Sequence, residues 1–165
     1  MILNKKEFKE LIDKFKETNT INKLTNQILN NNKEIADFES LSFTNTANEY
    51  LDRAIENLKD KQVYTFEEIM FLANQNLKEI AENNVNRYED DLRNELSKKF
   101  EYFIENENDY FNTFGWNNKN KININDMLTK AETFVLYKFL INFHSKLETK
   151  LKKELDKESY NEMTF

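Results

Sequence analysis

His144 is the only histidine in the chain and is followed directly by Ser145. Nucleophilic catalysis needs a positioned partner for such groups, and the sequence supplies none. The lack of cysteine excludes thiol chemistry and Cys-ligated zinc, and a lone glycine, Gly115, excludes a glycine-rich phosphate loop. We therefore expect His144 to be a partly buried core residue beside Leu140 and Leu147. The protein is expected not to be an enzyme, with no cofactor and no metal ion.

One enzymatic alternative rests on the segment KFLINFH, in which Lys138 precedes His144 with five residues between them. This spacing resembles the Arg-x4-6-His motif of HEPN ribonucleases, a helical family. The resemblance covers seven residues and implies RNA cleavage by His144 and Lys138 acting together across a dimer. The family has arginine where this chain has lysine, and the change removes the bidentate fork that recognises phosphate.

Acidic residues gather in the middle of the chain. Glu89 to Asp109 holds eight acids and three bases, whereas Asn117 to Lys157 holds nine lysines and five acids. Two antiparallel helices of opposite charge would set each other's register, which is the structural interpretation. The functional interpretation is a solvated acidic face that binds a basic groove by imitating nucleic-acid phosphates. Its candidate residues are Asp90, Asp91, Glu101 and Glu105.

An aromatic cluster follows the acidic stretch. The segment Tyr110 to Lys121 holds the only glycine and the only tryptophan, and we expect it to be the main irregular part of the chain. Tryptophan and tyrosine dominate binding hot spots, so the cluster is a second candidate partner surface. The alternative is that its rings fold back and cover one end of the bundle. The candidate residues are Tyr110, Phe114 and Trp116, with Phe111 beside them.

Lysines near the C-terminus indicate a third surface, for nucleic acid. Glu148, Glu154 and Asp156 interleave with them, and the pI of about 5.0 opposes binding of a polyanion by the isolated protein. As one subunit of a ribonucleoprotein the chain fits better, since neighbours would supply the rest of the groove. The lysines concerned are Lys146, Lys150, Lys152, Lys153 and Lys157.

Helices must position all of these residues. The chain has no proline and one glycine, the two strongest helix breakers. Apolar residues recur at helical spacing over 8–15, 21–28 and 47–58, and Asn4 with Glu7 resembles a capping box. We expect an all-α fold, with a single domain over residues 1–165 built as an irregular bundle of five to seven helices.

Two long helices are expected in that bundle. Thr65 and Glu68 form the best capping box and open a helical pattern over 66–104, whose apolar stripe turns by about 100° near Asn83. That helix either kinks there or packs its halves against different neighbours, which can include a second copy of the chain. The other covers 126–157 and is central, because 134–143 is apolar in nearly every direction. Its later stripe, Leu147, Leu151 and Leu155, is expected to be exposed or packed on a partner.

The composition bounds the protein class. With 39% hydrophobic and 33% charged residues, the chain is apolar enough to fold. Its 26 Asn and its 21 Lys against 3 Arg are typical of an A+T-rich genome, which indicates a low-GC bacterium or its phages and mobile elements. No secretory signal is visible, and the densest apolar run is ten residues long, too short to span a membrane. We expect a cytoplasmic protein without membrane contact.

The function expected from these features is contact with another protein or protein complex. A small acidic helical protein of this kind fits an inhibitor or immunity-type modulator, anti-CRISPR-like or antitoxin-like. The alternative is a helical structural subunit of a ribonucleoprotein or RNA-guided effector complex, and a HEPN-like ribonuclease comes third. The sequence is also compatible with a homodimer.

Overall fold

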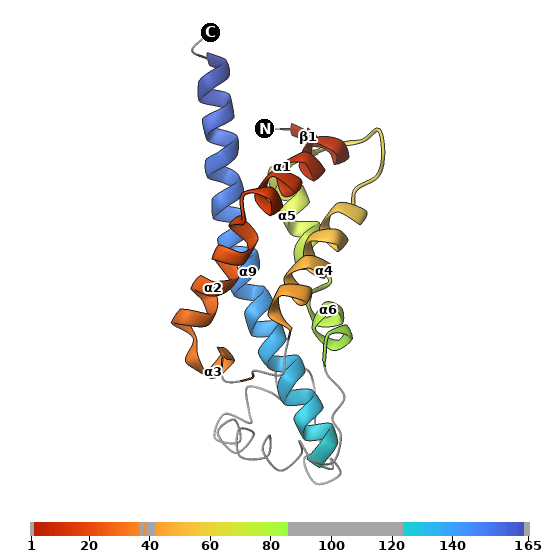
Figure 1. Ribbon diagram of the computed structural model, residues 1–165. Coiled ribbons are helices and arrows are strands. Elements are labelled where there is room, and N and C mark those ends of the chain that lie inside the picture. The colour runs from red at the N-terminus through yellow and green to blue at the C-terminus, as the bar shows by residue number, and fades with distance from the viewer. Residues whose placement is uncertain (1, 37, 39–41, 86–123, 164–165) are drawn as a thin grey trace.

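Helices dominate the part of the protein that the structure describes. The computed structural model describes residues 2–36, 38, 42–85 and 124–163 (Figure 1). Within those ranges the chain forms seven helices and one two-stranded sheet, so the predicted all-α bundle is confirmed. The organisation of residues 1–165 as a single domain stays a prediction.

The N-terminal helices are α1 (Lys5–Glu17), α2 (Thr20–Asn31) and the short α3 (Lys33–Ala36). The predicted capping box opens α1: the Glu7 amide donates to the Asn4 side chain at 2.8 Å, and the Asn4 amide donates to the Glu7 carboxylate at 3.0 Å. Between α1 and α2, Asn19 takes a left-handed φ of 61°, which asparagine tolerates better than most residues. The chain turns there, and α2 packs against α1 and α9.

A small sheet joins the N-terminus to the middle of the chain. Strand β1 (Ile2–Asn4) pairs antiparallel with β2 (Val63–Thr65), and Leu3 lies opposite Tyr64. Leu3 is buried, whereas Ile2 and Val63 are exposed on the other face. The sequence analysis did not predict these strands, because three residues are too few to show a period of two.

The predicted helix 66–104 is divided in its described part. Helix α4 (Phe43–Glu56) is followed, after β2, by α5 (Phe66–Asn74) and α6 (Leu77–Asn83). The expected capping residue, Thr65, accepts a hydrogen bond from the Glu68 amide at 3.1 Å. A single continuous helix from residue 66 is therefore wrong, and residues 86–104 lie outside the described residues.

One side-chain amide, from the residue that caps the C-terminal end of α4, accounts for the break between α5 and α6. The side-chain amide of Asn57, just after α4, donates to the Leu72 carbonyl at 3.2 Å. The backbone amide of Gln75 donates to the same carbonyl at 3.3 Å. That carbonyl would accept the Asn76 amide in a continued α-helix. The apolar positions Ile69 and Ile80 on either side of the break are both fully buried, so the stripe gave no sign of it.

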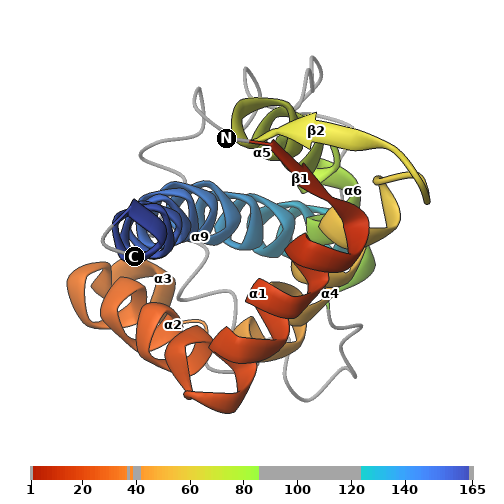
Figure 2. The same cartoon turned by 90° about the horizontal axis from the view of Figure 1, so that it is seen from above.

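Helix α9 (Ile124–Met163) is the centre of the bundle, as predicted for 126–157. Figures 1 and 2 show it running between α2 and α3 on one side and α5 and α6 on the other, and α4 also packs against it. Its buried residues in the predicted central segment surround the helix axis. They are Phe134, Val135, Leu136, Phe139, Leu140 and Phe143.

The later stripe of α9 corrects one expectation. Leu147, Leu151 and Leu155 are 1%, 0% and 4% exposed and belong to the same core. Helix α2 packs along α9, and Lys14 of α1 forms an ion pair with Glu154. The stripe is therefore covered by the chain's own N-terminal helices, which a periodicity argument along one helix does not reveal.

Candidate functional site

The acidic and aromatic candidates fall outside the described residues. This holds for all seven partner-binding residues predicted from sequence, and for the expected pairing of an acidic helix with a basic one. The two surfaces stay predictions. The seven residues are Asp90, Asp91, Glu101, Glu105, Tyr110, Phe114 and Trp116.

The lone histidine is held in the core, which confirms the expectation for it. Tyr50 of α4 is fully buried, and its hydroxyl lies 2.5 Å from His144 Nδ1. The other ring nitrogen, Nε2, lies 3.6 Å from Glu148 Oε2, and the histidine side chain is 15% exposed. Burial raises the pKa of the Tyr50 phenol far above its ordinary value, and the Glu148 charge adds to this. The phenol therefore keeps its proton and donates it to Nδ1.

The same surroundings keep the imidazole neutral. Burial lowers the pKa of His144, and the nearby Glu148 carboxylate offsets part of that change. With Nδ1 accepting from Tyr50, the ring proton belongs on Nε2, which faces Glu148. The Tyr50, His144 and Glu148 side chains thus form a chain of contacts that fastens α4 to α9.

Lys138 and His144 serve different contacts. The Lys138 ammonium lies 4.8 Å from the centroid of the Phe134 ring, one turn earlier on α9. Six residues at 100° each place Lys138 and His144 about 120° apart around the helix axis. The HEPN resemblance implies that the two residues act across a dimer, so it stays a prediction for a second copy of the chain.

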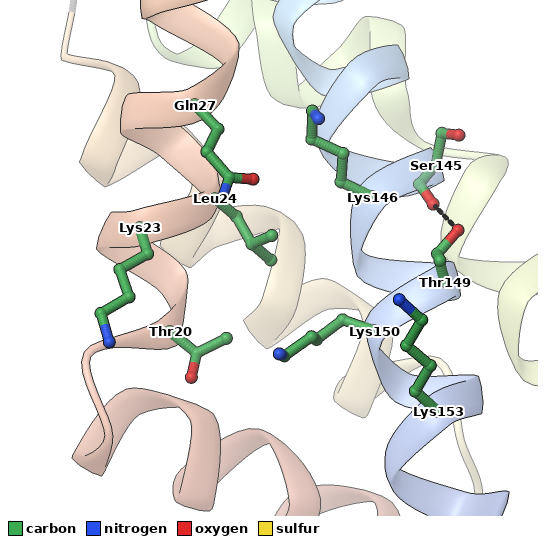
Figure 3. Close-up of a pocket in the computed structure, with 9 residues that line it drawn as sticks. All are labelled: Thr20, Lys23, Leu24, Gln27, Ser145, Lys146, Thr149, Lys150 and Lys153. Atoms are coloured by element: carbon green, nitrogen blue, oxygen red, sulfur yellow. Dashed lines mark hydrogen bonds between the residues drawn. The ribbon is translucent and has the colours of Figure 1, made fainter.

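A groove between α2 and α9 collects the lysines that the sequence singled out. It has a volume of about 450 Å³, and none of its nine lining residues is acidic (Figure 3). We call it the α2–α9 groove. Its lining residues are Thr20, Lys23, Leu24, Gln27, Ser145, Lys146, Thr149, Lys150 and Lys153.

Helix geometry explains how α9 presents its wall of the groove. Lys146, Lys150 and Lys153 follow the spacing i, i+4, i+7, which places them on one face. Leu147 and Leu151 lie on the adjoining side of the helix and are buried in the core. The helix is therefore fixed by its leucines and offers its lysines to the groove.

The α2 wall carries polar side chains without any acid. Residues 18–33 contain no aspartate or glutamate. Leu24 is buried against the core, while Lys23 and Gln27 are exposed. In Figure 3, Lys146 extends from α9 toward the level of Leu24 and Gln27, and Lys150 extends toward Thr20.

Two of the three acids that interleave with the lysines in sequence are engaged elsewhere, and the third, Asp156, is exposed and does not line the groove. Glu148 faces His144, and Glu154 forms an ion pair with Lys14. The hydrogen bond from Lys14 is the largest cause of a lowered pKa of Glu154, and the charges of Lys157 and Lys150 also lower it. Among the described residues, no carboxylate oxygen lies within 4.0 Å of the ammonium nitrogen of a groove lysine, which is the distance of an ion pair.

The groove offers the donors that a phosphate group needs. Ammonium groups attract the charge, and the Ser145 hydroxyl and the Gln27 side-chain amide can add neutral hydrogen bonds. Lys146, Lys150 and Lys153 were predicted from sequence as part of a nucleic-acid surface, whereas Lys23 and the other α2 residues were not. Their role depends on how α2 packs against α9, and the acid-free run over 18–33 was the only local signal.

Comparisons with known proteins leave the groove as the main guide to function. No protein-family model, no curated protein and no solved structure matches the chain. Among residues 2–36, 38, 42–85 and 124–163, no helix combines the length and apolarity needed to cross a membrane. Those residues also contain no group of three or more acidic, histidine or cysteine side chains able to hold a metal ion.

Proposed function

We propose that this protein works by binding another macromolecule and catalyses no reaction. The observation that carries the proposal is the α2–α9 groove, whose lining has four lysines and no acid. The histidine supports the same conclusion, because its Nδ1 is taken up by Tyr50 in the contact between α4 and α9. We place this function in the cytoplasm of a low-GC bacterium, or in one of its phages or mobile elements.

Two kinds of binding protein were expected, and the groove favours the second of them. An anti-CRISPR-like or antitoxin-like inhibitor would use the acidic and aromatic surfaces over 90–116. A helical subunit of a ribonucleoprotein would use a lysine-lined surface that faces nucleic acid. Lysine is depleted at protein interfaces and is the residue of choice, with arginine, for phosphate contacts. We therefore rank the ribonucleoprotein subunit first and the inhibitor second.

The net charge of −6 fits a subunit better than a free nucleic-acid protein. A free protein of this charge repels a polyanion at long range, which weakens association. Inside an assembly, neighbouring subunits hold the nucleic acid in place, and one basic groove then contributes its contacts locally. Screening limits the repulsion by distant acids to about 8 Å at physiological ionic strength.

Affinity capture of the tagged protein from a low-GC bacterial lysate, with and without ribonuclease, tests the proposal. A subunit should recover several proteins together with RNA, and the proteins should be lost after ribonuclease treatment. A single ribonuclease-resistant protein, inactive while bound, would instead establish the inhibitor. Recovery of no partner, with or without ribonuclease, would refute both the ribonucleoprotein subunit and the inhibitor. Purified RNA cleaved by the wild type and not by His144→Ala would refute the non-enzymatic proposal itself.

A further inference from the structure

We propose that the α2–α9 groove binds the sugar–phosphate backbone of single-stranded RNA without reading its sequence. This inference rests on the proposed subunit function for its biological setting. It adds the ligand, the surface and the mode of contact. The evidence is the charge of the groove, its dimensions and the hydrogen-bonding capacity of its neutral side chains.

The charge of the groove selects an anion. Lys23 lies on the α2 wall, and Lys146, Lys150 and Lys153 lie on the α9 wall, with no acid in the lining. Lys150 extends from α9 toward Thr20 on α2, whereas Lys146 runs alongside α9 (Figure 3). Like charges so placed repel one another, and an anion between the two helices relieves that repulsion.

The dimensions of the groove select a strand. The lining residues cover positions 20–27 of α2 and 145–153 of α9, so each wall is about 10–12 Å long at 1.5 Å per residue. At about 3.4 Å per nucleotide in a stacked strand, this length matches roughly three phosphates. A single strand can lie along the groove.

The neutral side chains favour RNA over DNA. The Thr149 hydroxyl donates its one proton to the Ser145 carbonyl at 3.1 Å, which leaves its oxygen as an acceptor. Gln27 offers a second acceptor on the opposite wall through its amide oxygen. A ribose 2′-hydroxyl can donate to such acceptors, and deoxyribose cannot.

The lining also explains why the sequence of the RNA should not matter. None of the nine lining residues is aromatic or an arginine, so the groove has no ring on which a base could stack and no fork for a base edge. A protein partner is disfavoured by the same composition, since interface cores are rich in aromatic residues and arginine and poor in lysine.

Fluorescence anisotropy of labelled oligouridylate, titrated with the full chain over a series of salt concentrations, tests this inference. Binding should weaken with salt, and the slope of log K against log salt should be about −0.7 for each phosphate contacted. The combined variant Lys146→Gln, Lys150→Gln, Lys153→Gln should lower the magnitude of the slope by about 2. Oligodeoxyuridylate of the same length should bind more weakly than the RNA.

Two further variants exclude trivial explanations. Lys6→Gln, Lys59→Gln and Lys152→Gln together remove the same charge from exposed lysines outside the groove, and this variant should keep the wild-type slope. Gln27→Lys adds a cation to the groove and should strengthen binding, a gain that misfolding cannot produce. Circular dichroism confirms that each variant is folded.

Several outcomes would overturn the inference. These are an equal reduction of the salt slope in the two triple variants, equal binding of DNA and RNA, and no binding of RNA by the wild type. Displacement of the RNA by tripolyphosphate at equal phosphate concentration would identify a small phosphorylated ligand, and equal binding of polyglutamate an acidic protein. If the triple groove variant still recovers the assembly from lysate and binds RNA normally, the groove inference fails while the subunit function stands. If affinity capture recovers no partner but the triple groove variant lowers the magnitude of the salt slope as expected, the subunit function fails while the groove inference stands.

Discussion

Replacing Tyr50 by phenylalanine tests the contact that fastens α4 to α9. The change removes only the hydroxyl, which lies 2.5 Å from His144 Nδ1, and leaves the ring that packs edge-on against Phe143 at 5.7 Å. The variant should therefore keep its fold and its packing. What it loses is a hydrogen bond between a fully buried side chain and a histidine that is 15% exposed.

The size of the effect follows from that burial. A typical hydrogen bond contributes about 1 kcal/mol, and a buried partner left unpaired costs about 1–3 kcal/mol. We expect Tyr50→Phe to lower the free energy of unfolding by about 1–3 kcal/mol near neutral pH. For a chain of this size, each 1 kcal/mol corresponds to about 2–4 °C in Tm.

The loss should also depend on pH, because the hydroxyl favours the neutral imidazole. The pKa of His144 is lowered from 6.5 in the folded protein, so the unfolded chain takes up the proton first as the pH falls. The free energy of unfolding is then greatest above pH 6.5 and decreases as the pH drops through 6.5 toward the folded pKa. Without the donor from Tyr50, the pKa of His144 rises, and the difference between wild type and variant shrinks at acidic pH.

Urea unfolding followed by circular dichroism, from about pH 8 to about pH 5, measures this difference across the titration of histidine. NMR gives the pKa directly, since the one imidazole signal belongs to His144. Tyr64→Phe is the matched control: its hydroxyl accepts from the Lys59 amide at 2.9 Å and donates to Gln62 at 3.0 Å, away from any histidine. The control should lose less stability, and its loss should be the same at every pH in this range.

The reasoning is refuted if Tyr50→Phe is as stable as the wild type near neutral pH. It is also refuted if the loss is unchanged between neutral and acidic pH, or if NMR finds the pKa of His144 no higher in the variant. An equal pH dependence in Tyr64→Phe would assign the effect to other groups.

Two further changes test the packing of α9. Leu151→Ala should lower the free energy of unfolding by about 2–5 kcal/mol in urea titrations of the isolated protein, because this leucine is 0% exposed; a negligible loss would mean that the stripe awaits a partner after all. Glu154→Gln should cost less than about 1 kcal/mol at neutral pH, because its partner Lys14 is half exposed. Since the pKa of Glu154 is lowered, that contribution is present above its ordinary value and lost as the pH falls through the folded pKa, so wild type and variant should converge in strongly acidic urea titrations.

Local signals predicted most of the fold. Helix α1 (Lys5–Glu17) begins at the predicted capping box of Asn4 and Glu7 and contains the predicted apolar spacing over 8–15. The central position of α9 followed from apolar side chains on every side of it. These features are written in short stretches of sequence, where hydrogen bonding and burial act between near neighbours.

What could not be predicted depends on contacts between distant residues. The break between α5 and α6 depends on Asn57, fifteen residues before the Leu72 carbonyl that it binds. Strand β1 exists because β2 lies beside it, about sixty residues later in the chain. The α2–α9 groove likewise needs α2 to lie along α9, and no pattern within either helix specifies that.

The charges of α9 show why net charge is a poor guide to what a helix can bind. Along the sequence, Glu148 follows Lys146 after one residue, and in a sum of charges the two cancel. On the helix they are separated by about 160° around the axis, so Glu148 faces His144 while Lys146 faces the groove. Glu154 lies nearer to Lys150, one turn away, but it is paired with Lys14 of α1. Glu154 thus links α9 to α1, Glu148 contacts His144 on α9 itself, and neither acid lines the groove. An acidic protein can in this way carry a basic groove, because the packing of the core decides which charges face the same space.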